Sequence, residues 1–115
     1  MKKVVVLGAT GTLGAPISIH LKGLGYDVTA VGHRKSDNGF FADHGIEYLS
    51  ADISVKSDFD KLPQENVYAV LNFAGALPAS MEGYNADLYV SSIIQGTLNV
   101  LEYTRKIKAD RIVFP

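Results

Sequence analysis

Short apolar runs alternate along the chain with segments of helical periodicity. Residues 4–7 read Val-Val-Val-Leu, a β-branched run that predicts a strand buried on both faces. A helix is predicted next, because apolar residues then recur at spacings of four, four and three, forming one stripe: Leu13, Ile17, Leu21 and Leu24. Glycines at positions 23 and 25 are typical of a helix end.

The same alternation continues through the rest of the chain. Further strands are predicted at Tyr26–Val31, Ile46–Leu49, Val67–Phe73 and Arg111–Phe114. Helices are predicted at Ser54–Leu62, with Ser54 as its N-cap, and from about Asn85 to Ile107. The apolar stripe expected for the longer helix is Val90, Ile94, Leu98 and Leu101. The polar segment Ser36–His44 fits either a loop or a short helix.

This order of elements predicts a doubly wound α/β fold. Strands separated by helices require right-handed crossovers, which place the strands in a parallel sheet. The sheet should hold about five strands, and residues 1–115 should form one domain.

Composition excludes several classes of function. The formal net charge is −1 and the lysines and arginines are scattered, which argues against nucleic acid or an anionic membrane as the partner. The chain has no cysteine, so disulfides, thiol nucleophiles and cysteine-based zinc sites are excluded, and no metal site is expected. No apolar run approaches 18 residues and the start does not resemble a signal peptide, so we expect a cytoplasmic protein.

A glycine-rich turn carries the main chemical signal. Residues 8–14 read Gly-Ala-Thr-Gly-Thr-Leu-Gly, between the first predicted strand and the first helix. Glycines at this position permit a tight turn and let backbone N–H groups approach a pyrophosphate, while the helix N-terminus adds partial positive charge. The turn therefore predicts dinucleotide binding, with a purely structural turn as the alternative.

The tip of the second predicted strand bears on the choice of nicotinamide cofactor. NAD enzymes place an acid about 20 residues along the chain to bind the ribose 2′-hydroxyl. Here that position is Gly32, followed by His33, Arg34 and Lys35. These side chains suit a 2′-phosphate, and Ser36 offers a further hydroxyl, so NADP is preferred over NAD. The alternative is a solvated basic loop.

Four segments together resemble the N-terminal part of an extended short-chain dehydrogenase/reductase, the NAD(P)-dependent epimerase/dehydratase family. They are the glycine turn, Asp52-Ile53 after the third strand, Asn72-Phe73-Ala74-Gly75 at the end of the fourth, and the run from Gly96 to Phe114. Taken alone, Asp52 fits a solvated turn and 72–75 an ordinary strand exit.

The resemblance implies a Rossmann-type sheet and roles for several residues. Asp52 would accept a hydrogen bond from the adenine amino group, and the small residues near 74 would let the backbone pass beside the adenine ribose. With the basic tip included, the candidate cofactor-binding residues are Gly8, Thr10, Gly11, Thr12, Leu13, Gly14, His33, Arg34, Lys35, Asp52, Ile53, Asn72, Phe73, Ala74 and Gly75.

The family's catalytic group is not found in this chain. The resemblance calls for a Ser or Thr and a Tyr-x-x-x-Lys pair, but none of the six tyrosines has a lysine four residues later. We therefore assign no catalytic residue within 1–115, and we expect the chain to be the inactive cofactor-binding part of a longer enzyme.

Two functions follow from the resemblance. The first is the cofactor-binding part of an epimerase, dehydratase or reductase acting on a small molecule, most commonly a nucleotide-sugar. The resemblance also makes a homodimer possible, since extended family members commonly pair through the long helix and the helix that follows it, which is not in this chain. The second is a non-catalytic NADP-binding regulator or redox sensor.

Overall fold

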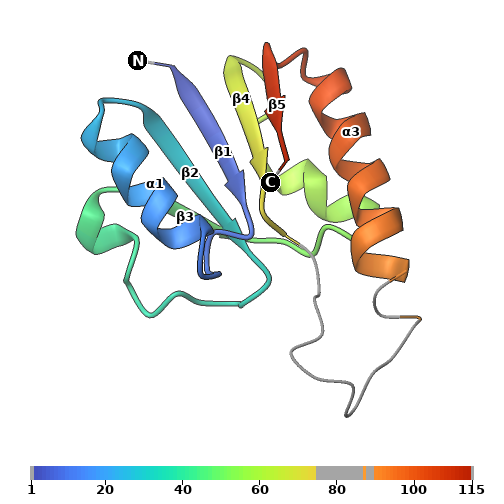
Figure 1. The fold of residues 1–115 in the computed structure, drawn as a ribbon, viewed down its shortest axis with the longest axis horizontal. Coiled ribbons are helices and arrows are strands. Elements are labelled where there is room, and N and C mark those ends of the chain that lie inside the picture. Colours follow the sequence, from blue (N-terminus) through green and yellow to red (C-terminus); the bar gives the residue numbers. More distant parts are fainter. Residues whose placement is uncertain (1, 75–86, 88–89, 115) are drawn as a thin grey trace.

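The computed structural model describes residues 2–74, 87 and 90–114 (Figure 1). Its elements, in chain order, are β1 (Lys3–Leu7), α1 (Gly14–Gly23), β2 (Asp27–Gly32), η1 (Ala42–His44), β3 (Glu47–Ser50), η2 (Lys56–Lys61), β4 (Val67–Asn72), η3 (Val90–Gln95), α3 (Gly96–Lys106) and β5 (Arg111–Val113). Within these ranges, no helix combines the length and apolar character needed to cross a bilayer.

The five strands form one parallel sheet in the order β3-β2-β1-β4-β5. β1 lies at the centre, where Val5 pairs with Thr29 of β2 and Val70 of β4. The chain runs outward from β1 to β3 on one side and from β4 to β5 on the other. The predicted doubly wound sheet is confirmed, and each predicted strand agrees with the observed one to within one or two residues.

Helices cover both faces of the sheet, so the chain has two apolar layers (Figure 1). Successive β1 side chains point to opposite faces. Val5 and Leu7 belong to the layer that contains α3 and η2, whereas Val4 and Val6 belong to the layer that contains α1. This two-sided burial explains why β1 reads as a continuous apolar run.

The predicted stripe of α1 is wrong at both ends. Leu13 is 56% exposed and Leu24 is 62% exposed. The residues of α1 that are buried are small, namely Gly14 and Ser18, and the Ser18 hydroxyl donates to the Gly14 carbonyl oxygen at 2.7 Å. Small side chains let the helix lie close to the sheet, and the leucines at its two ends then fall outside the contact.

The predicted stripe of the long helix is wrong at three of its four positions. Ile94, which lies in η3, and Leu98 and Leu101 of α3 are exposed, and the side chain of Val90 lies outside the described part. The face that packs on the sheet instead contains Gly96, Asn99, Val100, Tyr103 and Thr104, followed by Ile107. The helix thus carries two apolar faces, and periodicity alone does not say which one is buried. Residues 90–95 form a π-helical turn, and the predicted start near Asn85 lies outside the described residues.

The predicted helix at Ser54–Leu62 is a shorter 3₁₀ helix, η2, and Ser54 does not cap it. Val55 precedes its first residue, and the Ser54 hydroxyl donates to Asp52 at 2.7 Å. A nearby carboxylate accepts this hydroxyl, so it is not available to the helix amides. The undecided segment Ser36–His44 is a loop that ends in the short helix η1.

Candidate dinucleotide site

The candidate residues gather at the carboxyl-terminal edge of the sheet. Backbone hydrogen bonds continue past the strand ends and join the loops there: Ala9 N donates to Val31 O, Phe73 N donates to Leu7 O, and Ala51 N donates to Gly32 O, each at 2.9 Å. Because connections leave β1 and β4 in opposite directions, the carboxyl ends of these strands form the switch point of the topology, the position where doubly wound proteins bind ligands.

Each glycine of the turn after β1 has a different structural role. Gly8 has a φ of 75°, and a Cβ there would stand 2.5 Å from the Ala74 nitrogen. A Cβ on Gly14 would overlap the Gly8 carbonyl oxygen, so Gly14 permits the start of α1 to lie against the turn. Gly11 is exposed, and a Cβ there would meet only the Gly8 oxygen, at 3.3 Å. Gly11 is therefore the glycine that the fold itself does not require.

Backbone amides without an acceptor follow Gly11. Within the described residues, the N–H groups of Thr12, Leu13 and Gly14 have no recorded acceptor. The first turn of α1 has no acidic side chain and no side-chain cap. Donors at a helix start, together with its partial positive charge, suit an anionic group such as a pyrophosphate. Leu13, predicted as a core residue, belongs to this exposed turn.

Asp52 is held in a network of hydrogen bonds after β3. Its Oδ1 accepts from the Ser54 amide at 2.9 Å and from the Ser54 hydroxyl, and its Oδ2 lies 3.3 Å from His33 Nε2. Burial raises the pKa of the Asp52 carboxyl, but the bonds from Ser54 and the nearby His33 outweigh burial and lower that pKa below its usual value. The carboxylate is thus ionised and fixed in orientation.

Ile53 packs against α3, and this contact was not predicted. The Asn99 side chain is buried and its Nδ2 donates to the Ile53 carbonyl oxygen at 2.8 Å. A Cβ on Gly96 would stand 2.6 Å from Ile53 Cδ1, so the absence of a side chain there makes room for Ile53. Gly96 and Asn99 belong to the run 96–114 whose sequence resembles the family's pattern. The sequence alone did not show that these two residues support the loop after β3.

The exit from β4 lies against the glycine turn. Asn72 is buried, and its Oδ1 accepts from the Ala74 amide at 3.1 Å, which fixes the backbone where the strand ends. Phe73 and Ala74 are the backbone neighbours of Gly8. Gly75, the last predicted residue of this segment, lies outside the described residues.

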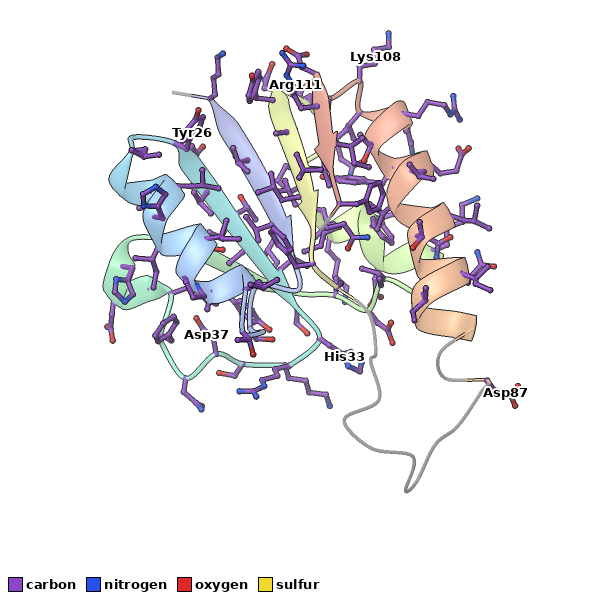
Figure 2. The ribbon with its side chains drawn as sticks, in the orientation of Figure 1. Tyr26, His33, Asp37, Asp87, Lys108 and Arg111 are labelled. Atoms are coloured by element: carbon purple, nitrogen blue, oxygen red, sulfur yellow. The ribbon has the colours of Figure 1, made fainter. Side chains whose placement is uncertain are left out.

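The tip of β2 presents the predicted basic residues to solvent. His33, Arg34 and Lys35 are all exposed, and Figure 2 shows His33 at the same edge of the molecule as Asp37.

At Gly32 a Cβ would stand 2.8 Å from Thr10 Cγ2 and 2.7 Å from the Tyr48 hydroxyl. The tip therefore touches the glycine turn, and Tyr48 is a neighbour that the sequence did not point to.

The described residues bring together the glycine turn, Asp52, the β4 exit and the β2 tip. They hold no group of three or more His, Cys, Asp or Glu side chains placed to bind a metal ion.

A family model described as the NAD dependent epimerase/dehydratase family matches residues 4–115. The chain belongs to this family.

Relatives of the chain are longer proteins. A Methanocaldococcus jannaschii protein named "Putative UDP-glucose 4-epimerase" is 30% identical over an alignment of 115 positions, which covers 96% of this chain and 36% of that protein. The crystal structure of a UDP-glucose 4-epimerase from Stenotrophomonas maltophila, with NAD and a formylated UDP-arabinopyranose bound, matches 99% of this chain and 36% of its own, at 24% identity and a TM-score of 0.84. Uronate dehydrogenase from Agrobacterium tumefaciens with NAD matches 99% of this chain and 40% of its own, at 19% identity and a TM-score of 0.79. The chain thus spans about a third of each relative.

Proposed function

We propose that this chain is the NADP-binding part of an enzyme of the epimerase/dehydratase family that acts on a nucleotide-sugar. Family membership supports dinucleotide binding, and the names of relatives that act on UDP-sugars support the substrate class. Because the chain spans only about a third of those proteins, the substrate pocket of the whole enzyme is expected mostly outside these residues.

The observation that carries the proposal is the exposed glycine at position 11 beside unpaired amides. Gly11 is exposed and a Cβ there would meet only the Gly8 carbonyl oxygen, at 3.3 Å, and the following amides of Thr12 and Leu13 have no acceptor within the described residues, so the backbone here is open to a pyrophosphate. Asp52 supplies a fixed acceptor for the adenine amino group, and the backbone at Phe73–Ala74 supplies a surface for the ribose. When bound, a nicotinamide cofactor supplies hydride transfer.

Three features of the β2 tip favour NADP over NAD. First, position 32 holds no acid, and the gap between Thr10 and Tyr48 leaves no room for one. Second, Arg34 and Lys35 are exposed cations. Third, the acid of this loop, Asp37, already accepts bonds from the amides of Gly39 and Phe41, at 3.1 and 2.8 Å. A fork of guanidinium donors suits the oxygens of a 2′-phosphate.

Calorimetric titration of the chain with NADP and NAD tests the proposal. We expect NADP to bind more tightly than NAD. We expect Arg34→Ala to lower the affinity for NADP by about 10- to 100-fold with little effect on the affinity for NAD, because charged hydrogen bonds contribute about 1.5–3 kcal/mol. Arg105→Ala is the matched control, since Arg105 is an exposed arginine on α3 paired with Glu102. Tighter binding of NAD, or equal losses for both cofactors in Arg34→Ala, contradicts the NADP assignment.

We also propose that the exposed face of α3 is covered by a second copy in the whole protein. Leu98 and Leu101 of α3, and Ile94 of the preceding η3, have exposed apolar side chains, and buried apolar area is the main driving force of association. Sedimentation of Leu98→Lys against the unchanged protein tests this. A dimer that persists in the variant contradicts it.

A further inference from the structure

Tyr48 contacts the loop 33–41 near both of its ends. Its hydroxyl donates to the Arg34 carbonyl oxygen at 2.5 Å. Its ring stacks on Phe41, with centroids 5.7 Å apart and planes 2° from parallel. Phe41 is 1% exposed, so the second contact anchors the loop in the core.

The space that the Tyr48 hydroxyl occupies exists because residue 32 is glycine. A Cβ there would stand 2.7 Å from the hydroxyl oxygen and 2.8 Å from Thr10. The hydroxyl thus lies where the acid of an NAD enzyme would begin. It connects the tip of β2 to β3 across this gap.

Other contacts hold the middle of the loop but not Arg34. Asp37 accepts from two amides further along, and the Ser36 hydroxyl oxygen accepts from the Asn38 amide at 3.0 Å. Within the described residues, the bond from Tyr48 is the one hydrogen bond that Arg34 makes. The position of the Arg34 backbone therefore depends on this hydroxyl.

The charges around the hydroxyl keep it in the donating form. Burial and the Asp37 carboxylate raise the pKa of Tyr48, and the Arg34 guanidinium acts in the opposite direction. The net pKa lies above the ordinary value of a tyrosine, so the O–H is present at neutral pH.

We propose that Tyr48 is a positioning residue that sets the preference for NADP. By fixing the Arg34 backbone, it preorganises the guanidinium to bind the 2′-phosphate, without itself touching the cofactor. This inference rests on the proposed NADP preference. A side chain held in place before binding loses less conformational freedom on binding, and this difference corresponds to about three- to ten-fold in affinity.

Titrations of Tyr48→Phe with NADP and NAD test the inference. This variant keeps the ring on Phe41 and removes only the hydroxyl. We expect NADP to bind about three- to ten-fold more weakly and NAD to bind within two-fold of its original affinity. Tyr26→Phe is the matched control, because Tyr26 lies at the opposite end of β2 from His33 (Figure 2).

The double variant Tyr48→Phe with Arg34→Ala separates positioning from a general loss of structure. If Tyr48 acts through Arg34, its substitution has no further effect on NADP affinity once Arg34 is alanine. Adenosine 2′,5′-bisphosphate should show the same losses as NADP, and AMP should show none. Equal weakening of NADP and NAD in Tyr48→Phe, or additive losses in the double variant, overturns the inference.

The two proposals fail in different ways. If Arg34→Ala leaves NADP binding unchanged, the NADP assignment fails and the role of Tyr48 fails with it. If Arg34→Ala weakens NADP but Tyr48→Phe does not, only the role of Tyr48 is overturned. Near-UV circular dichroism of each variant establishes that it is folded before titration.

Discussion

The Asn99 side chain donates a 2.8 Å hydrogen bond to the carbonyl oxygen of Ile53, across 46 positions of the chain. Gln95 donates in turn to Asn99 Oδ1 at 3.0 Å, so both polar ends of the buried amide are used. The bond connects α3 to the loop that carries Asp52. A helix on one face of the sheet thereby fixes an element of the candidate cofactor site.

Asn99→Leu should destabilise the fold. The substitution leaves the Ile53 carbonyl without its partner in a buried place, which costs about 1–3 kcal/mol. Urea denaturation followed by circular dichroism measures the loss. Gln95→Ala is the comparison variant, because it keeps the bond to Ile53 and removes only the bond that the exposed Gln95 donates to Asn99 Oδ1, so we expect a smaller loss than in Asn99→Leu. Equal stabilities of Asn99→Leu and the original protein would show that the bond contributes nothing.

Gly11→Ala and Gly14→Ala should separate binding from folding. At Gly11 a Cβ has one neighbour at 3.3 Å, so we expect a folded protein with at least ten-fold weaker NADP binding. At Gly14 a Cβ overlaps backbone, so we expect a loss of stability of about 1–3 kcal/mol or more. Thermal unfolding and calorimetry of both variants provide the comparison.

Gly23→Ala is the matched control for these two variants. A Cβ at this α1 position meets nothing within 4 Å, so the helix should gain up to about 1 kcal/mol from the better propensity of alanine. NADP affinity should not change. A Gly11→Ala protein that binds NADP as tightly as Gly23→Ala would remove the glycine turn from the site.

The acid sensitivity of the fold should depend on Ser54. Because the pKa of Asp52 is lower in the folded protein than in the unfolded chain, its contribution to stability is fully present above the unfolded value of about 3.9. That contribution is lost as the pH falls through the folded pKa. Ser54→Ala removes a bond to the carboxylate, so the pKa of Asp52 should rise. The loss of folding stability on acidification should then begin at a higher pH. Carboxyl carbon NMR of Asp52 reports the shift directly, and an unchanged titration refutes this account.

The parts of the fold that local pattern determines could be predicted from the sequence. The run at 4–7 is β-branched and apolar because both faces of β1 are buried, and the glycine turn follows it at once. The α3 stripe could not be predicted, because Leu98 and Leu101 are as apolar as the buried Val100. Only tertiary packing selects the face that contacts the sheet.

The geometry of the candidate site could be predicted where the backbone conformation requires a residue type, and not where side chains distant in the sequence meet. Gly8 needs a positive φ, which the sequence signals by its glycine. Tyr48 and Asn99 act through single bonds to distant carbonyl oxygens, at Arg34 and Ile53. A tyrosine in a short strand and an asparagine in a helix carry no local signal of such partners.

The 115-residue chain should bind NADP and catalyse no turnover. The proposed binding elements, among them Gly11 and Asp52, lie in the described residues, but the sequence contains no Tyr-x-x-x-Lys pair to transfer a proton or to hold the nicotinamide ribose. A positioned proton donor contributes about 10²–10⁴-fold, and orientation of the substrate contributes more. Contacts to adenine and phosphate should therefore dominate, and adenosine 2′,5′-bisphosphate should compete nearly as well as whole NADP. We expect no change in absorbance at the nicotinamide band with a panel of UDP-sugars. Measured turnover by the purified chain would refute this prediction and would require a catalytic group other than the family's tyrosine and lysine.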